Sequence, residues 1–346
     1  MRKLIFLVCI LSALILPVHA MNYTAPDAPD SAQDLMPVET QSFGKDLWKV
    51  ITSAVSSLRP DIAEAVGVCL SLIAVVMLVS ILRSMPGNSI HVVEFVGTLA
   101  VAAIILQRTN SMIDLAAETI TEVSEYGKLL LPVMTAAMAA QGGVTASTAL
   151  YAGTAAFDAL LSSGISKLLI PMVYVFLALA LAASATGEEM LKKLQGFLKW
   201  LVTWCLKTIL YIFTGYMGIT GVVSGSADAA ALKATKLTMS GMIPVVGGIL
   251  SDASEAVVVS AGVMKNAVGV YGMVAISAIC ISPFLKIGVQ YLLLKLTAAL
   301  CEVFGVKRIS GLIQAFSTAM GLLLGMTGAV CVLLLISTVC FMKGVG

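Results

Sequence analysis

Charged and aromatic residues are scarce in this sequence, and their scarcity excludes several classes of protein. Charged residues make up 12% of the 346 positions and aromatic residues 6%, whereas 59% are hydrophobic. A soluble domain typically has about 25% charged and about 45–50% apolar residues. The net charge is only +2, without a basic block interleaved with aromatic residues, so the sequence predicts no nucleic-acid partner. We expect an integral membrane protein whose main surroundings are the lipid bilayer.

Histidine and closely spaced cysteine are also rare, which argues against metal sites and histidine-dependent catalysis. Of the two histidines, His19 lies in the N-terminal leader, and only His91 would remain after processing. The seven cysteines stand singly in apolar runs, as small buried hydrophobic residues do. GxxxxGK[ST], HExxH and paired intramembrane aspartates are all missing. The sequence therefore predicts no enzyme, cofactor or metal, and energy for any transport would come from a partner or a gradient.

Residues 1–20 have the pattern of a secretory signal peptide. Arg2 and Lys3 precede an apolar run over residues 4–16, and a small-residue site predicts cleavage after Ala20. An uncleaved first helix is the alternative. Either version places the residues that follow outside the cytoplasm.

Residues 21–61 are expected to form an external acidic segment that ends in a short amphipathic helix. Proline, aspartate, serine and threonine dominate its first half, which has too few apolar residues to order itself. From Phe43 to Val55 the apolar residues recur at helical spacing, which predicts a helix on the outer membrane face.

The next two regions are expected to be a helical hairpin and an external helix. Residues 62–107 predict an N-terminal hairpin with spans over 62–82 and 92–107, since about 20 apolar residues cross a bilayer. Residues 108–128 predict an external amphipathic helix, because four acids lie on one helical stripe. We interpret the stripe as a solvated face, and a cation site is the alternative. These acids are Asp114, Glu118, Glu122 and Glu125.

Two apolar segments contain residues that interrupt helices. The stretch "SGMIPVVGGILSDASE", residues 240–255, contains a proline, a glycine pair and then small and acidic residues. Residues 129–153, "LLLPVMTAAMAAQGGVTASTALYAG", have the same order of proline, glycine pair and small residues. We expect both segments to be broken or re-entrant.

The two segments also begin similar stretches of sequence, which indicates an internal repeat. Pro132 and Pro244 lie 112 positions apart, as do Pro171 and Pro283. "KKLQGFL" and later "GITGVV" in the first stretch resemble "KRISGLI" and "GMTGAV" in the second, in the same order. This order favours a direct repeat of 129–223 and 241–341 joined by a linker over 224–240. Shared composition of membrane helices is the alternative.

Basic residues predict the orientation of the chain in the membrane. Six spans that start outside after the leader place the densest basic clusters on the cytoplasmic side, as the positive-inside rule requires. These clusters contain Arg83, Lys192, Lys193, Lys199, Lys286, Lys295, Lys307 and Arg308. The expected fold is an all-α polytopic membrane bundle with about six spans, two broken or re-entrant segments and two repeats in parallel orientation.

The interrupted segments are also the candidate functional site. A backbone broken at membrane depth is tolerated only where protein or a water-filled cavity satisfies its polar groups. We therefore hypothesise that these segments line or gate a transport path, whereas surface hairpins or structural wedges are the alternative. The candidate residues are Pro132, Gly142, Gly143, Pro244, Gly247, Gly248, Asp252 and Glu255.

Three charged residues in apolar stretches have competing interpretations. Intramembrane charges are functional candidates in general, and Asp158 and Lys207 qualify by position. Lys207 could instead extend toward the basic cytoplasmic face. Asp252 could instead begin a helix that continues through residues 257–263.

The second interrupted segment resembles a known family. "SGMIPVVGGILSDASEAV", followed by "KNAVGVYG" and "ISPFLKI", is similar to the stage III sporulation protein AE family of endospore-forming bacteria. The resemblance extends over about residues 40–341 and is most specific from Ser240 to Lys286. No catalytic set is carried over with it.

The resemblance implies a role in sporulation. It implies a multi-pass subunit of the secretion-like channel complex in the mother-cell membrane around the forespore, which supports late forespore gene expression. The implied partners are other stage III sporulation membrane proteins, including a secretion-type ATPase and ring-forming subunits. A permease or export-gate subunit is the first expectation, and the alternatives are a scaffold that anchors ring-forming partners or a stand-alone secondary transporter.

Overall fold

The described part of the chain is helical. The computed structural model describes residues 24–37, 42–85, 90–242 and 247–343, and describes residues 90 and 221–261 by their backbone alone. The predicted signal peptide therefore lies outside the described residues. The elements are α2 Asp30–Gln33, α3 Phe43–Ser57, α4 Arg59–Ser84, α5 Ile90–Ala140, α6 Val144–Gly164, η1 Ile165–Leu169, α7 Ile170–Thr186, α8 Glu189–Met242, α9 Gly247–Val303 and α10 Lys307–Lys343.

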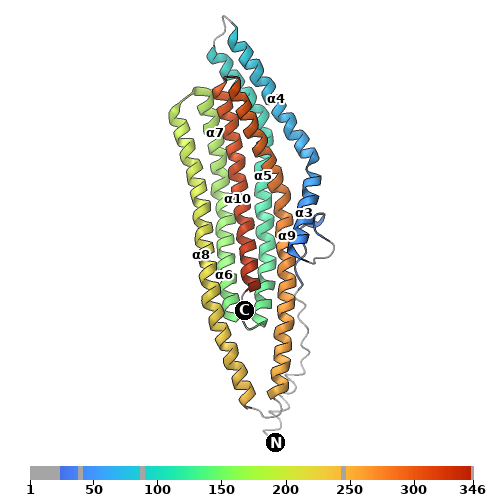
Figure 1. Cartoon of the computed structure of the whole chain (residues 1–346). Helices are drawn as coiled ribbons and strands as arrows, with labels where there is room; N and C mark the ends of the chain where they lie inside the picture. The colour runs from blue at the N-terminus through green and yellow to red at the C-terminus, as the bar shows by residue number, and fades with distance from the viewer. Residues whose placement is uncertain (1–23, 38–41, 86–89, 243–246, 344–346) are drawn as a thin grey trace.

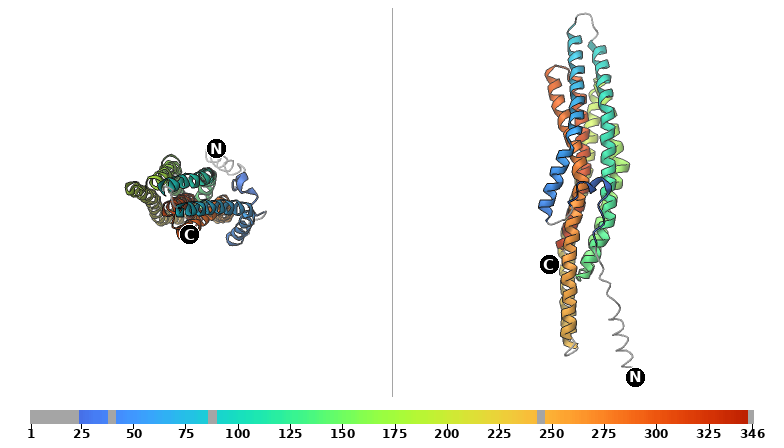
Figure 2. Two further views of the ribbon diagram at one scale, coloured as in Figure 1. Left: turned by 90° about the horizontal axis from the view of Figure 1, so that it is seen from above. Right: turned by 90° about the vertical axis from the view of Figure 1, so that its right-hand side faces the viewer.

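The long helices run alternately up and down an elongated bundle (Figure 1). The α4, α6–η1–α7 and α9 segments rise to one end, and α5, α8 and α10 return from it. We call this the charged end, because it carries Arg83, Glu94, Lys192, Lys307 and Arg308. The opposite end, where α5 turns into α6 and α8 is followed by α9, is called the hairpin end. Figure 2 shows that the bundle is narrow when it is viewed along its axis.

Six of the described helical segments are long and apolar enough to cross a membrane, which confirms the six expected spans. The first two of these segments contain the predicted spans 62–82 and 92–107. The helices are nevertheless much longer than a bilayer requires. The α5, α8 and α9 helices have 51, 54 and 57 residues, or about 77–86 Å at 1.5 Å per residue, against a hydrocarbon core of about 30 Å. They therefore extend well beyond one membrane face.

The α10 helix lies at the centre of the bundle. It contacts α5, α6, α7, α8 and α9, and its buried side chains include Phe316, Met320 and Leu333. Small residues let neighbouring helices approach closely, which is the usual packing in membrane bundles. Gly127 of α5 lies against Leu334, and Gly153 of α6 lies against the ring of Tyr216 in α8.

The expectation that Pro132 interrupts its helix is wrong. The α5 helix continues through this proline to Ala140. Pro132 is exposed, whereas its neighbours Leu130 and Met134 pack beside Gly272 and Gly269 of α9. This packing maintains the helix although proline cannot donate a backbone hydrogen bond. Residues 108–128 are likewise the middle of α5 and not a separate helix.

The second interruption is also shorter than expected. The α8 helix includes the predicted linker 224–240 and ends at Met242, and α9 begins at Gly247, so residues 251–255 are helical. Pro244 lies outside the described residues. The first segment is therefore a helix–turn–helix connection, and in the second the two helices are separated by residues 243–246 alone, so neither is an extended break. The tendency of proline and glycine to break a helix is a local propensity, and contacts between packed helices can override it.

The two predicted repeat units have the same order of structural features. In the first, η1 is followed at once by α7, whose second residue is Pro171, and α7 is capped by Gly187, whose φ is +81°. In the second, Pro283 lies inside α9, and Gly305 follows with a φ of +77°. A helix with basic residues near its start comes next in both units, since Lys192 and Lys193 follow Glu189 in α8 and Lys307 begins α10. This correspondence agrees with a repeat, which stays a prediction.

Candidate functional site: the two ends of the bundle

The predicted path residues gather at the hairpin end. Gly142 and Gly143 form the turn between α5 and α6, and Gly247 and Gly248 begin α9. Asp252 and Glu255 lie in the first turns of α9 by their backbone position. Pro132 lies within α5, before the α5–α6 turn.

The Gly142–Gly143 turn depends on a backbone conformation that favours glycine. Gly142 has a φ of +92°, and its N–H donates to the carbonyl of Ala139 at 2.9 Å. The N–H of Gly143 donates to the carbonyl of Met138 at 3.2 Å. A left-handed residue of this kind commonly ends a helix. The glycine pair that suggested a broken membrane segment therefore ends α5 and allows the chain to reverse.

The structure does not bring the two sets of path residues together. The side chain of Gln141, at the α5–α6 turn, lies directly against Gly262 of α9. Residues 247–262 thus continue past this turn by about 22 Å at 1.5 Å per residue. The α8–α9 hairpin is accordingly the longer of the two and projects beyond the rest of the bundle (Figure 1). Within one chain, the two interruptions lie at one end but at different heights.

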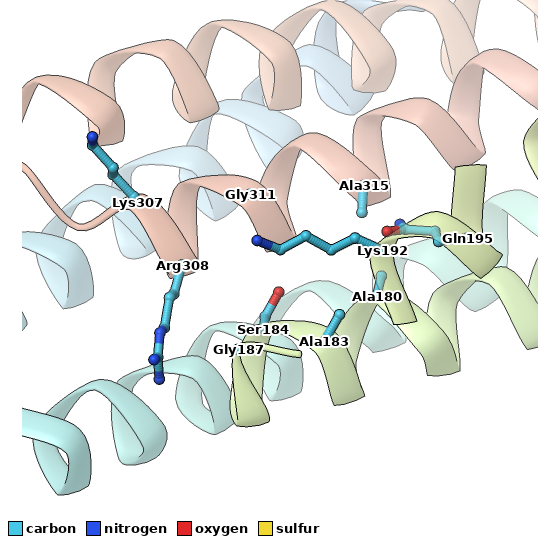
Figure 3. Close-up of a pocket in the computed structure, with 10 residues that line it drawn as sticks. All are labelled: Ala180, Ala183, Ser184, Gly187, Lys192, Gln195, Lys307, Arg308, Gly311 and Ala315. Atoms are coloured by element: carbon cyan, nitrogen blue, oxygen red, sulfur yellow. The ribbon is translucent and has the colours of Figure 1, made fainter. Parts of the chain in front are cut away.

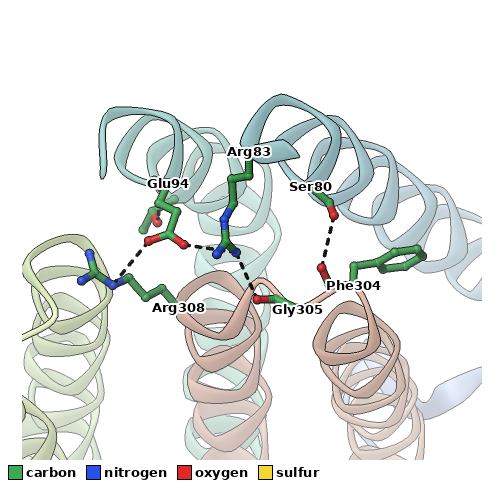
Figure 4. A network of polar contacts seen from close by, with 7 residues as sticks. Ser80, Arg83, Glu94, Phe304, Gly305 and Arg308 are labelled. Carbon is green, nitrogen blue, oxygen red and sulfur yellow. Dashed lines mark hydrogen bonds and ion pairs between the residues drawn. The ribbon is translucent and has the colours of Figure 1, made fainter. Parts of the chain in front are cut away.

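A network of charged and polar side chains joins three segments at the charged end (Figure 4). Glu94 of α5 lies between Arg83 of α4, at 3.2 Å, and Arg308 of α10, at 3.6 Å. Arg83 also donates to the carbonyl of Gly305 at 3.1 Å, and Ser80 donates to the carbonyl of Phe304 at 3.2 Å. The network therefore fastens the α4–α5 hairpin to the α9–α10 turn.

Partial burial makes this network stronger than an ordinary surface ion pair. The Glu94 side chain is 11% exposed, and those of Arg83 and Arg308 are 30% and 35% exposed. A largely dehydrated carboxylate needs opposite charges and hydrogen bonds to compensate for lost hydration. Two guanidinium groups provide that compensation here. Removing either arginine would leave Glu94 with one partner.

A second charged layer lies below the first, toward the hairpin end. Arg108 of α5 is 2.7 Å from Glu64 and 3.9 Å from Asp61, both in α4, and Lys286 of α9 is 3.4 Å from Asp61. The expectation that Lys286 lies on the same side as Arg83 is therefore wrong, because its partner Asp61 is at the other end of α4. The stretch of α4 from Asp61 to Arg83 measures about 33 Å at 1.5 Å per residue. Apolar side chains such as Leu70, Leu78 and Ile81 are exposed between these ends. This length of α4 is close to the hydrocarbon thickness of about 30 Å, whereas Glu94 and Arg108 of the two layers lie about 21 Å apart along α5.

Polar contacts also join helices in the hairpin half of the bundle. Ser124 of α5 donates to a carboxylate oxygen of Asp158 in α6 at 2.6 Å, and both residues are buried. The hydroxyls of Thr154 and Ser337 lie against each other between α6 and α10. Asp158 therefore lies between helices and not toward lipid. Lys207 is exposed on α8.

Sequence reasoning missed Glu94 as a functional candidate, although a signal was present. It is a single carboxylate inside the otherwise apolar run "HVVEFVGTLAVAA". Such a residue needs a cationic partner, but the partners come from positions 83 and 308, which only the folded arrangement brings together.

The long apolar helices and the two charged layers define a multi-pass helical membrane protein. Within this class the chain belongs to the stage III sporulation protein AE family, whose model matches residues 31–344. It is 26% identical over 195 residues to the stage III sporulation protein AE of Bacillus subtilis (strain 168), across 56% of this chain and 48% of the relative. The match thus spans about half the length of that relative. No solved structure matches the chain.

Proposed function

We propose that the chain is an integral membrane subunit of the channel complex that joins the mother cell to the forespore. In this proposal it crosses the mother-cell membrane around the forespore and supports late forespore gene expression. Its family and its six long apolar helices support the assignment. Its partners would be other stage III membrane proteins, including a secretion-type ATPase and ring-forming subunits.

Within the complex, the chain would act as a permease or export-gate subunit. The observation that carries this role is the projecting α8–α9 hairpin, because it extends beyond the bundle at the end where the interrupted segments gather. The core of the described bundle is filled by large apolar side chains such as Tyr126, Phe213 and Phe316. A path would therefore form between chains, with hairpins from neighbouring subunits around it.

A membrane scaffold for ring-forming partners is the second candidate. The filled core favours it, because a bundle of this kind can anchor partners without conducting anything. The outward face of α8 favours it as well, since Tyr211, Ile212 and Ile219 are exposed there in the half of the bundle below the second charged layer.

Shortening the projecting hairpin would test the two roles. Deleting residues 236–242 and 247–253 removes seven residues from each arm, or about two helical turns, and preserves the phase of both helices. The shortened and parent proteins would be expressed in sporulating cells, with two measurements. Co-purification would report assembly with stage III partners, and a reporter of late forespore transcription would report function.

The two roles predict different results. A gate predicts normal partner recovery and reporter activity lowered at least tenfold, whereas a scaffold predicts loss of both. As a control outside the candidate path residues, Leu160→Ala would change an exposed side chain of α6, and we expect it to retain both signals. Normal reporter activity with the shortened hairpin would contradict the gate.

A further inference from the structure

A cavity of about 230 Å³ lies at the charged end between α7, α8 and α10 (Figure 3). Lys192 and Gln195 of α8, Lys307 and Arg308 of α10, and Ser184 of α7 contribute its polar groups. In Figure 3 the Lys192 side chain crosses the cavity toward Gly311, and the Ser184 hydroxyl points toward its interior. The remaining lining residues are alanine or glycine, which leave space between the helices. One water molecule needs a cavity volume of only about 10–15 Å³, so this cavity can hold a much larger group.

The charges around the cavity favour an anion. Three of its lining side chains are cationic and none is acidic. Carboxylates lie nearby, since Glu189 is 2.8 Å from Lys192 and Glu94 is 3.6 Å from Arg308. The Lys192–Glu189 pair is exposed on both sides, and pairs of this kind contribute little stability, so Lys192 can turn to another anion. Lys307 has no ion-pair partner in the described part of the chain.

The first turn of α10 adds to this preference. Lys307 and Arg308 begin α10, and the free N–H groups and partial positive charge of a helix start favour anions. Gly187, which ends α7, leaves room for the guanidinium of Arg308, because a Cβ there would lie 2.8 Å from its Nη2. In Figure 3 the Lys192 ammonium and the Ser184 hydroxyl point into the cavity, the Arg308 guanidinium lies at its side beside Gly187, and the Lys307 ammonium points away and would turn inward to reach a phosphate oxygen.

The surroundings of the cavity indicate that this phosphate belongs to a lipid. Leu194 and Phe197 of α8 are exposed beside Gln195, and they lead to Trp200 and Trp204, which are stacked and more than half exposed. Exposed aromatic residues next to basic ones are typical of the membrane interface. An acyl chain can therefore lie along α8 while the headgroup occupies the cavity, whereas free phosphate would gain nothing from this apolar surface.

We propose that the cavity between α7, α8 and α10 binds the phosphate headgroup of an anionic phospholipid. Basic cavities between membrane helices are established recognition sites for such headgroups. The bound lipid would join α8, which lies at the edge of the bundle, to the central α10. This proposal is independent of the channel role.

The test is lipid-dependent thermal stabilisation of the purified full-length chain in neutral detergent. Phosphatidylglycerol, phosphatidylcholine and inorganic phosphate would be titrated separately, and apparent affinity would be derived from the rise in melting temperature. The double variant Lys192→Gln/Lys307→Gln should bind phosphatidylglycerol roughly 30-fold more weakly, since each basic residue near an anionic headgroup contributes about 1 kcal/mol, or about fivefold in affinity. The matched control Lys193→Gln/Lys343→Gln removes the same charge at exposed positions outside the cavity and should change the affinity less than threefold.

A third variant tests the volume of the cavity independently of its positive charge. Gly311→Leu fills the cavity without removing a cation, and a Cβ at Gly311 meets no atom within 4 Å, so the fold should tolerate it. We expect it to abolish the preference for phosphatidylglycerol over phosphatidylcholine. Three results would each overturn the proposal. The first is equal stabilisation of the parent protein by phosphatidylglycerol and phosphatidylcholine, and the second is an equal loss of affinity in the control variant. The third is unchanged binding of phosphatidylglycerol by Gly311→Leu. Equal stabilisation by inorganic phosphate would overturn the lipid assignment and identify a soluble phosphate as the ligand.

Discussion

The α8 and α10 helices end the two predicted repeat units, yet they occupy very different places in the bundle. Both begin just after a glycine with positive φ and carry lysine or arginine near their start. The α10 helix is surrounded by five other long segments, whereas α8 lies at the edge and exposes Trp200, Trp204 and Tyr211. Corresponding positions in a repeat therefore do not imply corresponding burial.

Differences in composition explain why one helix is central and the other peripheral. Between Ile309 and Met342, α10 contains no charged residue, and it has glycines at 311, 321, 325 and 328. Residues 189–220 of α8, whose side chains are described, contain lysines at 192, 193, 199 and 207. Charged side chains are costly to bury without a partner, and small residues permit close packing on several sides. A central position is thus open to α10 and unfavourable for α8.

The largest expected effect comes from removing a phenylalanine at the centre of this comparison. Phe316 of α10 is 1% exposed, so Phe316→Ala should lower the free energy of unfolding by about 3–5 kcal/mol, through lost contacts and an unfilled cavity. Phe197 of α8 is 52% exposed, and Phe197→Ala should cost less than about 1 kcal/mol. Denaturant unfolding in mixed micelles would measure both. Similar losses for the two variants would contradict a central α10 and a peripheral α8.

A smaller effect is expected where α8 attaches to the bundle. Gly153 of α6 lies against the ring of Tyr216, which donates a hydrogen bond to the carbonyl of Ala149 at 2.9 Å. Gly153→Ala should therefore push α8 outward at a cost of about 1–3 kcal/mol. Gly215→Ala provides the control on α8, because its Cβ meets nothing within 4 Å, and we expect a neutral or slightly stabilising change. If thermal unfolding gives equal melting temperatures for both variants, the contact does not hold α8.

The two positive-φ glycines test the correspondence of the units directly. Gly305→Ala should cost about 1–2 kcal/mol, because a left-handed backbone is strained for alanine, although a Cβ there meets no atom within 4 Å. Gly187→Ala should cost more than Gly305→Ala, by up to about 1 kcal/mol, because its Cβ also displaces the Arg308 guanidinium from Glu94. Melting temperatures of both variants in the same detergent would rank them. The reverse order would show that the Gly187 turn does not position Arg308.

Hydropathy predicted the spans well because helix length and apolar content are local properties. The six segments, the acidic stripe on α5 and the amphipathic α3 all follow from residues within one helix. The charged network could not be predicted in the same way, because Arg83, Glu94 and Arg308 meet only after three helices have packed. The interrupted segments were misjudged for a related reason. Whether a proline bends, ends or merely occupies a helix depends on neighbours such as Gly269 and Gly272.

The smallest effect is expected at Pro132, the residue that begins the first predicted unit. Pro132→Ala restores a backbone hydrogen-bond donor within α5, which should stabilise the folded state by about 0.5–1.5 kcal/mol. The substitution also increases the conformational entropy of the unfolded chain, which should lower the free energy of unfolding by about 0.4–1 kcal/mol. We therefore expect a net change within about 1 kcal/mol and normal late forespore transcription. Gly142→Ala is the informative partner, since a φ of +92° should make it cost about 1–2 kcal/mol. If Pro132→Ala loses late forespore transcription and Gly142→Ala retains it, the functionally important residue is the proline and not the glycine turn.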